Sequence, residues 1–251
     1  MKITPKRIGA VIQARMDSNR LPGKVLMVIG RKPVLSHCVE RLKQCKQLDA
    51  IVIATSKNKS DDPIARFARS HHIACFRGSL TNVLERTIQA ADAQALDVVV
   101  RVCADSPFID PSLVDKFVTL FLKGGYDYLS CLDTAVPHGL ENEVVSLDAL
   151  KKSLSCAKSD DDHEHVTRYI LMHRNKFKVR LVAVKGFKKF ISQYFTLDTP
   201  EDLEFLRAMH ACAEKGNRLA TTKQLYAALT RFPRLRTINA YRALRKSLRS
   251  Q

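Results

Sequence analysis

The sequence predicts an α/β protein built on a doubly wound, mostly parallel Rossmann-like sheet. Short apolar runs rich in Val and Ile alternate with helical patterns from the start of the chain, and this alternation is typical of βα units that build a parallel sheet. The helical patterns also begin at marked positions, where Asp or Thr precedes the first turn. With 251 residues, 45% of them hydrophobic, the chain can bury a substantial core.

The regular βα pattern covers the first half of the chain. The expected strands are residues 8–12, 50–54, 73–76, 98–103 and 126–130. The expected helices are residues 33–45, 62–71, 82–93 and 111–122. Asp61, Thr81 and Asp110 stand just before the last three of these helices, where an N-cap side chain accepts hydrogen bonds from the first turn.

After residue 130 the pattern becomes less regular. We expect helices at 147–156 and up to residue 174, an acidic turn at 159–162, and strands near 178–184 and 194–197. Residues 199–202 (TPED) predict a further helix, because a capping Thr, a proline and two acids are typical of a helix start.

The formal net charge of +17 is concentrated near the C-terminus. Residues 207–251 contain eleven Lys and Arg but only one acid, Glu214. Such a charge favours anionic partners such as nucleotides, nucleic acid or an anionic membrane surface. The spacing of the leucines between Leu225 and Leu248 also suits amphipathic helices packed on a neighbour. We therefore expect residues 208–251 to form a basic helical C-terminal extension, and its role stays open.

Other features of the sequence predict a cytoplasmic protein. No stretch approaches the ~20 consecutive apolar residues that a membrane span requires, and the N-terminus lacks the pattern of a signal peptide. The seven cysteines are scattered and include no C-x-x-C pair, so neither a disulfide framework nor a zinc site is indicated.

A basic loop follows the first expected strand. Arg15, Arg20 and Lys24 surround a Pro-Gly turn at the carboxyl end of a strand, where doubly wound sheets bind ligands. Arginine can hold two phosphate oxygens at once, lysine offers a compact charge, and glycine lets a ligand approach the backbone. The loop therefore predicts a polyphosphate site, although the G-x-G-x-x-G and G-x-x-x-x-G-K-[ST] patterns are absent. The alternative is a solvated basic loop.

Residues 13–24 (QARMDSNRLPGK) resemble the signature of the cytidylyltransferases that make CMP-sialic acid and CMP-KDO. The branch first named for spore coat polysaccharide biosynthesis is the most similar. Further motifs follow in order at residues 51–56 (IVIATS), 76–79 (FRGS), 83–86 (VLER), 100–108 (VRVCADSPF), 139–144 (GLENEV), 164–167 (EHVT) and 197–203 (LDTPEDL). The resemblance covers about residues 7–207 and implies a fold of the nucleotide-diphospho-sugar transferase type.

The resemblance implies a nucleotidyltransferase domain in residues 1–207, in which 131–190 bind the sugar and form the contact of a homodimer. It implies transfer of CMP from CTP to a sugar acid of the nonulosonic type, with release of pyrophosphate, in surface polysaccharide biosynthesis. Such a transfer needs positioning and charge neutralisation more than a covalent nucleophile. The alternatives are a glycosyltransferase of similar architecture and, from another class, a nucleic-acid-binding protein that uses the basic extension.

The functional residues of this family can be carried over one by one. Arg15 and Lys24 are implied to hold the triphosphate and, with Asp105, to be catalytic. The implied nucleotide-binding residues are Gln13, Ala14, Arg15, Ser18, Arg20, Gly23, Lys24, Ala54, Thr55 and Arg77. The implied sugar-binding residues are Glu141, Glu143, His165 and Thr167.

Asp105 and Asp198 are implied to hold Mg²⁺. Asp105 follows the fourth expected strand, and magnesium usually takes one or two protein carboxylates and completes its shell with phosphate oxygens and water. Both aspartates also have a structural alternative. Asp105 can shape a turn before Pro107, and Asp198 can belong to the start of the helix at 199–202.

Overall fold

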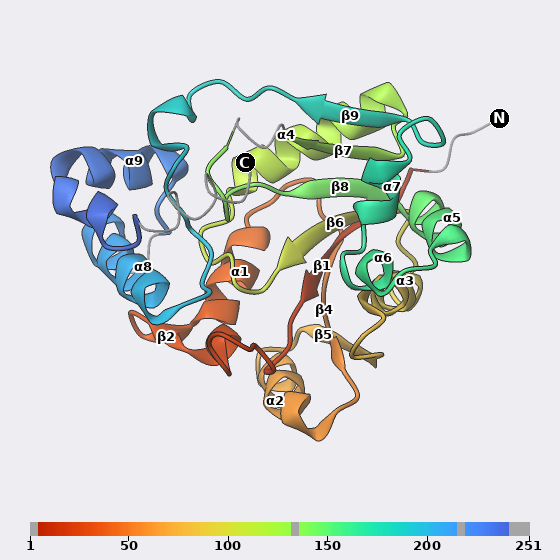
Figure 1. The fold of residues 1–251 in the computed structure, drawn as a ribbon, viewed down its shortest axis with the longest axis horizontal. Helices are drawn as coiled ribbons and strands as arrows, with labels where there is room; N and C mark the ends of the chain where they lie inside the picture. Colours follow the sequence, from red (N-terminus) through yellow and green to blue (C-terminus); the bar gives the residue numbers. More distant parts are fainter. Residues whose placement is uncertain (1–4, 132–135, 215–218, 241–251) are drawn as a thin grey trace.

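The computed structural model describes residues 5–131, 136–214 and 219–240. A seven-stranded sheet in the order β5-β4-β1-β6-β8-β7-β9 forms the centre of the molecule (Figure 1). The strands are β1 (Ile8–Gln13), β4 (Ala50–Ser56), β5 (Ala74–Gly78), β6 (Val98–Cys103), β7 (Tyr128–Cys131), β8 (Glu143–Ser146) and β9 (Val179–Val182). Neighbouring strands pair in parallel except at β8, which is antiparallel to β6 and β7. The predicted α/β class with a mostly parallel sheet is confirmed.

Helices cover both faces of this sheet (Figure 1). One core includes side chains of α1 (Val34–Leu42), α2 (Asp62–Ser70), α4 (Pro111–Gly124), α8 (Pro200–Ala213) and α9 (Thr222–Arg231). The other core includes side chains of α3 (Val83–Asp92), α5 (Leu147–Cys156) and α7 (Arg168–Met172), and α6 (Asp160–Glu164) packs on α3. Short elements outside these layers are the hairpin of β2 (Val28–Ile29) and β3 (Lys32–Pro33), and 3₁₀ turns at Lys24–Leu26, Lys59–Asp61, Lys188–Phe190 and Pro233–Thr237.

Strand β1 contributes to both cores. Ala10 and Ile12 lie in the core of α1, whereas Val11 lies in the core of α3. Because successive side chains of a strand point to opposite faces, Gln13 faces the same side as Val11. The last residue of β1 is therefore directed toward α3.

The predicted strands and helices of the first half are all present, with ends that differ by a few residues. Of the three N-caps expected in the first half, one is confirmed and two differ from the prediction. Asp110 caps α4 as predicted, since it accepts from the N–H groups of Ser112 and Leu113. Asn82, rather than Thr81, caps α3, and the Asp61 side chain does not cap α2.

The second half of the chain departs further from the predictions. The helix at 147–156 is α5, the expected acidic turn is the short helix α6, and the strand near 178–184 is β9. The predicted strand at 194–197 is wrong, because this segment makes only one bridge, from Tyr194 to His138. Strand β8 was not predicted. It has four residues, and only its pairing between β6 and β7 makes it a strand.

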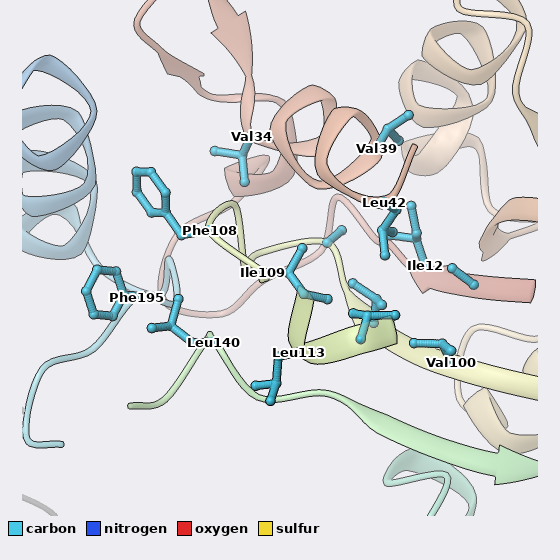
Figure 2. Close-up of a cluster of buried hydrophobic side chains, with 14 of the residues drawn as sticks. Ile12, Val34, Val39, Leu42, Val100, Phe108, Ile109, Leu113, Leu140 and Phe195 are labelled. Atoms are coloured by element: carbon cyan, nitrogen blue, oxygen red, sulfur yellow. The ribbon is translucent and has the colours of Figure 1, made fainter. Parts of the chain in front are cut away.

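Buried aromatic residues fix the segments that follow β6 and precede α8 (Figure 2). Phe108 and Phe195 lie edge to face, with ring centroids 6.0 Å apart. Leu197 is also buried, and its N–H donates to the carbonyl of Asp105 (2.8 Å). The core therefore holds two segments side by side that are far apart in the sequence.

The expected boundary after residue 207 falls inside α8, which runs from Pro200 to Ala213. Beyond this helix, Glu214 and the carbonyl of Ala220 accept hydrogen bonds from the buried Arg41 of α1, at 2.6 and 2.7 Å. The described part of the extension packs on the same core through Leu225, Ala228 and Leu229, and residues 241–251 lie outside the described residues. Within the described ranges, no helix is both long and apolar enough to cross a bilayer.

Replacement of Leu229 by Ala tests whether α9 belongs to this core. The side chain is fully buried in the cluster that contains β1 and α1, and a Leu→Ala change at such a position costs about 2–5 kcal/mol. We expect urea denaturation to show a loss of this size in the free energy of unfolding. The control is Leu122→Ala in α4, because Leu122 is 41% exposed. Equal effects of the two changes would contradict the packing of α9.

Candidate active site

A cavity of about 390 Å³ opens at the carboxyl ends of β1 and β6. The predicted site residues that line it are Gln13, Ala14, Arg15, Ser18, Arg20, Lys24, Asp105, His165 and Asp198. Its wall also contains Val83 and Arg86 of α3, Arg101 and Cys103 of β6, and Glu164 of α6. The fold therefore brings most of the predicted nucleotide and metal residues to one place.

The loop after β1 is held in shape by its backbone. The N–H of Gly23 donates to the carbonyl of Met16 (2.8 Å), and Gly23 has a φ of +71°, which favours glycine. The N–H of Met16 donates to Asp61 (2.6 Å), and the other Asp61 oxygen accepts from the N–H of Ser56 (3.1 Å). Asp61 therefore ties the loop to the end of β4, which explains why it does not cap α2. Gly23 shapes the turn and does not line the cavity.

Lys24 joins two carboxylates across the cavity. Its Nζ donates to Asp105 and to Asp198 (2.8 Å), and Arg20 also contacts Asp198 (2.9 Å). Burial lowers the pKa of Lys24, but Asp105 and Asp198 outweigh burial and raise it above its ordinary value. The ammonium group therefore stays charged at neutral pH and neutralises part of the acidic pair.

The side chains of both aspartates contact Lys24. Helix α8 begins with a capping box in which Thr199 and Asp202 exchange hydrogen bonds. The N–H of Asp198 itself donates to Asp202 (3.0 Å), so the Asp198 carboxylate is directed to Lys24 and Arg20 instead. The side-chain hydrogen bond of Asp105 likewise goes to Lys24. Both carboxylates are therefore held toward Lys24 at the cavity.

The acidic pair fits a magnesium ion by its donor chemistry. Two carboxylates converge on one ammonium group, so they can also converge on a metal ion. Oδ1 of Asp105 is buried and has no hydrogen-bond partner among the described residues. Magnesium prefers such oxygen donors and needs only one or two from the protein.

Arg15 and Glu164 form an ion pair at the edge of the cavity. The pair spans 3.3 Å between Nη2 and Oε1, and both side chains are about half exposed. An exposed pair of this kind contributes about 0.2–1 kcal/mol. Arg15 can therefore exchange Glu164 for a phosphate at low cost.

Besides Gly23, three further predicted nucleotide residues do not line the cavity. Ala54 and Thr55 are fully buried in β4. Arg77 donates to the carbonyls of Ser56 and Asn58 (both 2.8 Å) and pairs with Asp62 (2.7 Å). Arg77 therefore fixes the chain beyond β4, and Val83 and Arg86 of α3 line the cavity.

Glu143 is the centre of a partly buried polar network beside the cavity. It accepts from Arg101 Nη1 (2.6 Å), from the Tyr128 hydroxyl (2.6 Å) and from Thr167 Oγ1 (2.9 Å). Burial raises the pKa of Glu143, but Arg101, Tyr128 and Thr167 outweigh burial and hold it below its ordinary value. The carboxylate therefore stays ionised and fixes Arg101 in the cavity wall.

The predicted sugar residues thus have different environments. His165 lines the cavity. Glu143 and Thr167 lie behind its wall and act through Arg101. Glu141 contacts His138 (2.5 Å) and accepts from the N–H of Gly139, so it shapes the turn before β8.

Glu143→Gln tests the buried network through its pH dependence. The folded pKa of Glu143 lies below the value of about 4.3 in an unfolded chain. Its charge therefore stabilises the fold above that pH, and this stabilisation is lost as the pH falls through the folded pKa. We expect the variant to lose about 1.5–3 kcal/mol of unfolding free energy at pH 7. In urea denaturation, the difference from the wild type should shrink below about pH 4.

The control for this measurement is Glu164→Gln, which removes only the exposed pair with Arg15. It should cost less than about 1 kcal/mol at pH 7. A loss in Glu143→Gln that stays constant from pH 7 to about pH 3 would contradict the ionised network.

A cationic loop after the first strand and a carboxylate beyond β6 meet at the carboxyl edge of a doubly wound sheet. This arrangement is typical of α/β proteins that bind a nucleotide at this edge of the sheet. A sequence model of the family described as cytidylyltransferase matches residues 10–230, and the chain belongs to this family.

Similar proteins agree with this assignment. The chain is 34% identical over 228 residues to the spore coat polysaccharide biosynthesis protein SpsF of Bacillus subtilis, covering 89% of this chain and 94% of that protein. It is 26% identical over 236 residues to a 3-deoxy-manno-octulosonate cytidylyltransferase of Anaeromyxobacter, covering 88% and 90%. A cytidylyltransferase structure from Leptospira borgpetersenii matches with a TM-score of 0.84 and 28% identity, covering 92% and 97%. The protein is a CTP-dependent nucleotidyltransferase, as predicted.

Proposed function

We propose that the protein transfers CMP from CTP to a sugar acid of the nonulosonic type and releases pyrophosphate, in the synthesis of a surface polysaccharide or glycan. The observation that carries this proposal is the contact of Lys24 with both Asp105 and Asp198 beside the cationic loop. The similarity to proteins named for spore coat polysaccharide and 3-deoxy-manno-octulosonate supports the class of acceptor.

In this reaction the loop binds the triphosphate. Arg15, Arg20 and Lys24 supply charge, and the Ser18 side chain lies beside them in the cavity wall. These cations stabilise the charge that grows on the leaving pyrophosphate while the acceptor hydroxyl attacks the α-phosphorus in line. No covalent step through the protein is needed. Burial raises the pKa of the Cys103 thiol to about 11, so this thiol is not a nucleophile at neutral pH.

Asp105 and Asp198 are the residues that would hold Mg²⁺. When bound, the ion would neutralise phosphate charge and orient the acceptor hydroxyl. The triphosphate competes with the two carboxylates for Lys24, and Lys24 then stabilises phosphate charge instead of the acidic pair.

The proposal includes a homodimer formed through residues 131–190. Met172 in α7 belongs to this range and is 66% exposed, so its side chain is available for a contact with a second subunit. Asp162 and Arg168 pair between α6 and α7 and so fix this part of the chain.

The proposed reaction is tested by incubating the protein with each nucleoside triphosphate, Mg²⁺ and a panel of nonulosonic acids. We expect pyrophosphate release with CTP and at least one sugar acid, together with a CMP-sugar product. A glycosyltransferase would instead consume a nucleotide sugar and release the nucleotide. Pyrophosphate that forms equally well without any sugar acid would exclude the proposed acceptor class.

The roles of Lys24 and Asp105 are tested by Lys24→Ala and Asp105→Asn. Each lost charge-assisted contact with phosphate is worth about 1.5–3 kcal/mol, so Lys24→Ala should lower turnover by about one to two decades. Asp105→Asn keeps the shape but removes the charge that a metal requires, so turnover should fall by several decades with a raised Mg²⁺ requirement. The control is Lys32→Ala, since Lys32 pairs with Glu40 outside the cavity. Wild-type Mg²⁺ dependence in Asp105→Asn would refute the metal site.

A further inference from the structure

The fold brings two basic segments of the chain together at one end of the molecule. Residues 183–194 and 219–240 each contain several Lys or Arg and no acid. The Tyr226 hydroxyl of α9 donates to the carbonyl of Phe187 (3.2 Å), and its ring contacts the rings of Phe187 and Phe190 edge to face. Figure 1 shows the first segment beside α9. The two segments therefore contribute to one surface.

Four exposed cations define this surface, which we call the basic face: Lys189, Arg231, Arg234 and Arg236. Lys189 Nζ lies 3.5 Å from Oγ1 of Thr230, the residue before Arg231, so cations of both segments are neighbours. None of the four forms a salt bridge with an acid in the described part of the chain. The cations of the active-site loop, in contrast, are paired with carboxylates. The charge of the basic face is therefore available to an anionic partner.

Phe232 gives the basic face an apolar tip. The residue is the C-cap of α9 and is 40% exposed, and Pro233 after it is exposed as well. The Arg231 guanidinium lies over the Phe232 ring, 5.4 Å from its centroid. An apolar ring among cations suits the boundary between the headgroups and the acyl chains of a bilayer.

A hollow beside Arg236 offers room for a headgroup. Its volume is about 500 Å³, and Arg236 and Pro233 line it together with Ser192 of the other segment. The side chains of Arg236 and Ser192 are both exposed and carry hydrogen-bond donors. Because a guanidinium can hold two phosphate oxygens at once, the hollow suits a phosphate group.

We propose that the basic face binds the anionic surface of a lipid bilayer, with the cations on headgroup phosphates and Phe232 at the depth of the headgroups. Stable peripheral binding needs two contributions, and a cluster of cations with an apolar side chain supplies both. No residue of the basic face lines the cavity of the active site. The inference therefore does not depend on the proposed reaction.

A nucleic acid is the other anionic polymer that a basic surface can bind, and the structure favours the bilayer. Basic proteins bind single strands by stacking the bases on exposed aromatic rings. The Tyr226 ring is packed against Phe187 and Phe190 and belongs to the edge of the core. Between residues 219 and 240 this leaves Phe232 alone as an exposed ring. A duplex is bound mainly through its phosphates, so it makes no use of Phe232.

Sedimentation of the full chain with lipid vesicles tests the inference. Vesicles of phosphatidylcholine with phosphatidylglycerol should bind the protein, and vesicles of phosphatidylcholine alone should not. The double variant Arg234→Gln, Arg236→Gln should bind about 25-fold more weakly, since each cation near an anionic surface contributes about fivefold. Phe232→Ser keeps the charge and should still weaken binding at least about fivefold, because it removes the apolar contribution.

The matched control is the double variant Arg66→Gln, Arg69→Gln, which removes the same charge from exposed positions of α2. It should bind the anionic vesicles nearly as the wild type does, and all variants should keep the wild-type melting temperature. Equal losses in the two double variants would overturn the inference, because binding would then follow net charge alone. Absence of binding by the wild type at physiological ionic strength would also overturn it.

Competition with duplex DNA separates the two classes of partner. Phe232→Ser should leave DNA binding unchanged, because a duplex offers its phosphates and no apolar layer. An amount of DNA that matches the charge of the anionic lipid should leave most of the protein on the vesicles. Release of the protein by this amount of DNA would assign the basic face to a nucleic acid and overturn the inference.

Discussion

The contact of Lys24 with Asp105 and Asp198 is the interaction on which the site depends. Two carboxylates that share one cavity repel each other, and one ammonium group between them removes most of this repulsion. The contact joins the loop after β1, the turn after β6 and the segment before α8. The buried rings of Phe108 and Phe195 fix two of these segments, and Asp61 fixes the third through the N–H of Met16. Apolar packing and one buried carboxylate thus place the charges before any ligand arrives.

The side chains that line the cavity differ in chemistry from one side to the other. On the side of α3, buried donors and acceptors have fixed orientations, as in the contacts of Arg86 with the carbonyl of Ser79 and of Gln13 with Thr87. At the ends of β1 and β6, exposed cations and the acidic pair meet instead. The second arrangement suits a flexible, highly charged chain of phosphates, and in the proposed reaction it would hold the triphosphate.

The sequence could predict the parts of this arrangement that have a local signal. Alternating βα patterns marked the first strands, and the resemblance to a family marked Lys24 and Asp105, which the structure brings together. The short strand β8 depends on pairing with distant segments, so no local pattern reveals it. The leucine spacing indicates an amphipathic helix at α9 but not which core this helix joins. Arg86 has a weak signal, because it lies three residues after Val83 and four before Ala90, on the buried side of α3. Helical periodicity alone does not distinguish such a buried arginine from a ligand-binding one.

The loop cations are already paired with acids in the cavity. Arg15 contacts Glu164, Arg20 contacts Asp198, and Lys24 contacts both aspartates. A triphosphate must therefore displace carboxylates, and its binding leaves the acidic pair without its ammonium partner. In the proposed reaction, Lys24 would no longer compensate the repulsion between Asp105 and Asp198, so phosphate binding would raise the affinity of this pair for a divalent cation. Because coupling of this kind is reciprocal, an ion held by Asp105 and Asp198 also releases Lys24 to the nucleotide. In the proposed reaction, nucleotide and magnesium thus favour each other's binding through the same lysine.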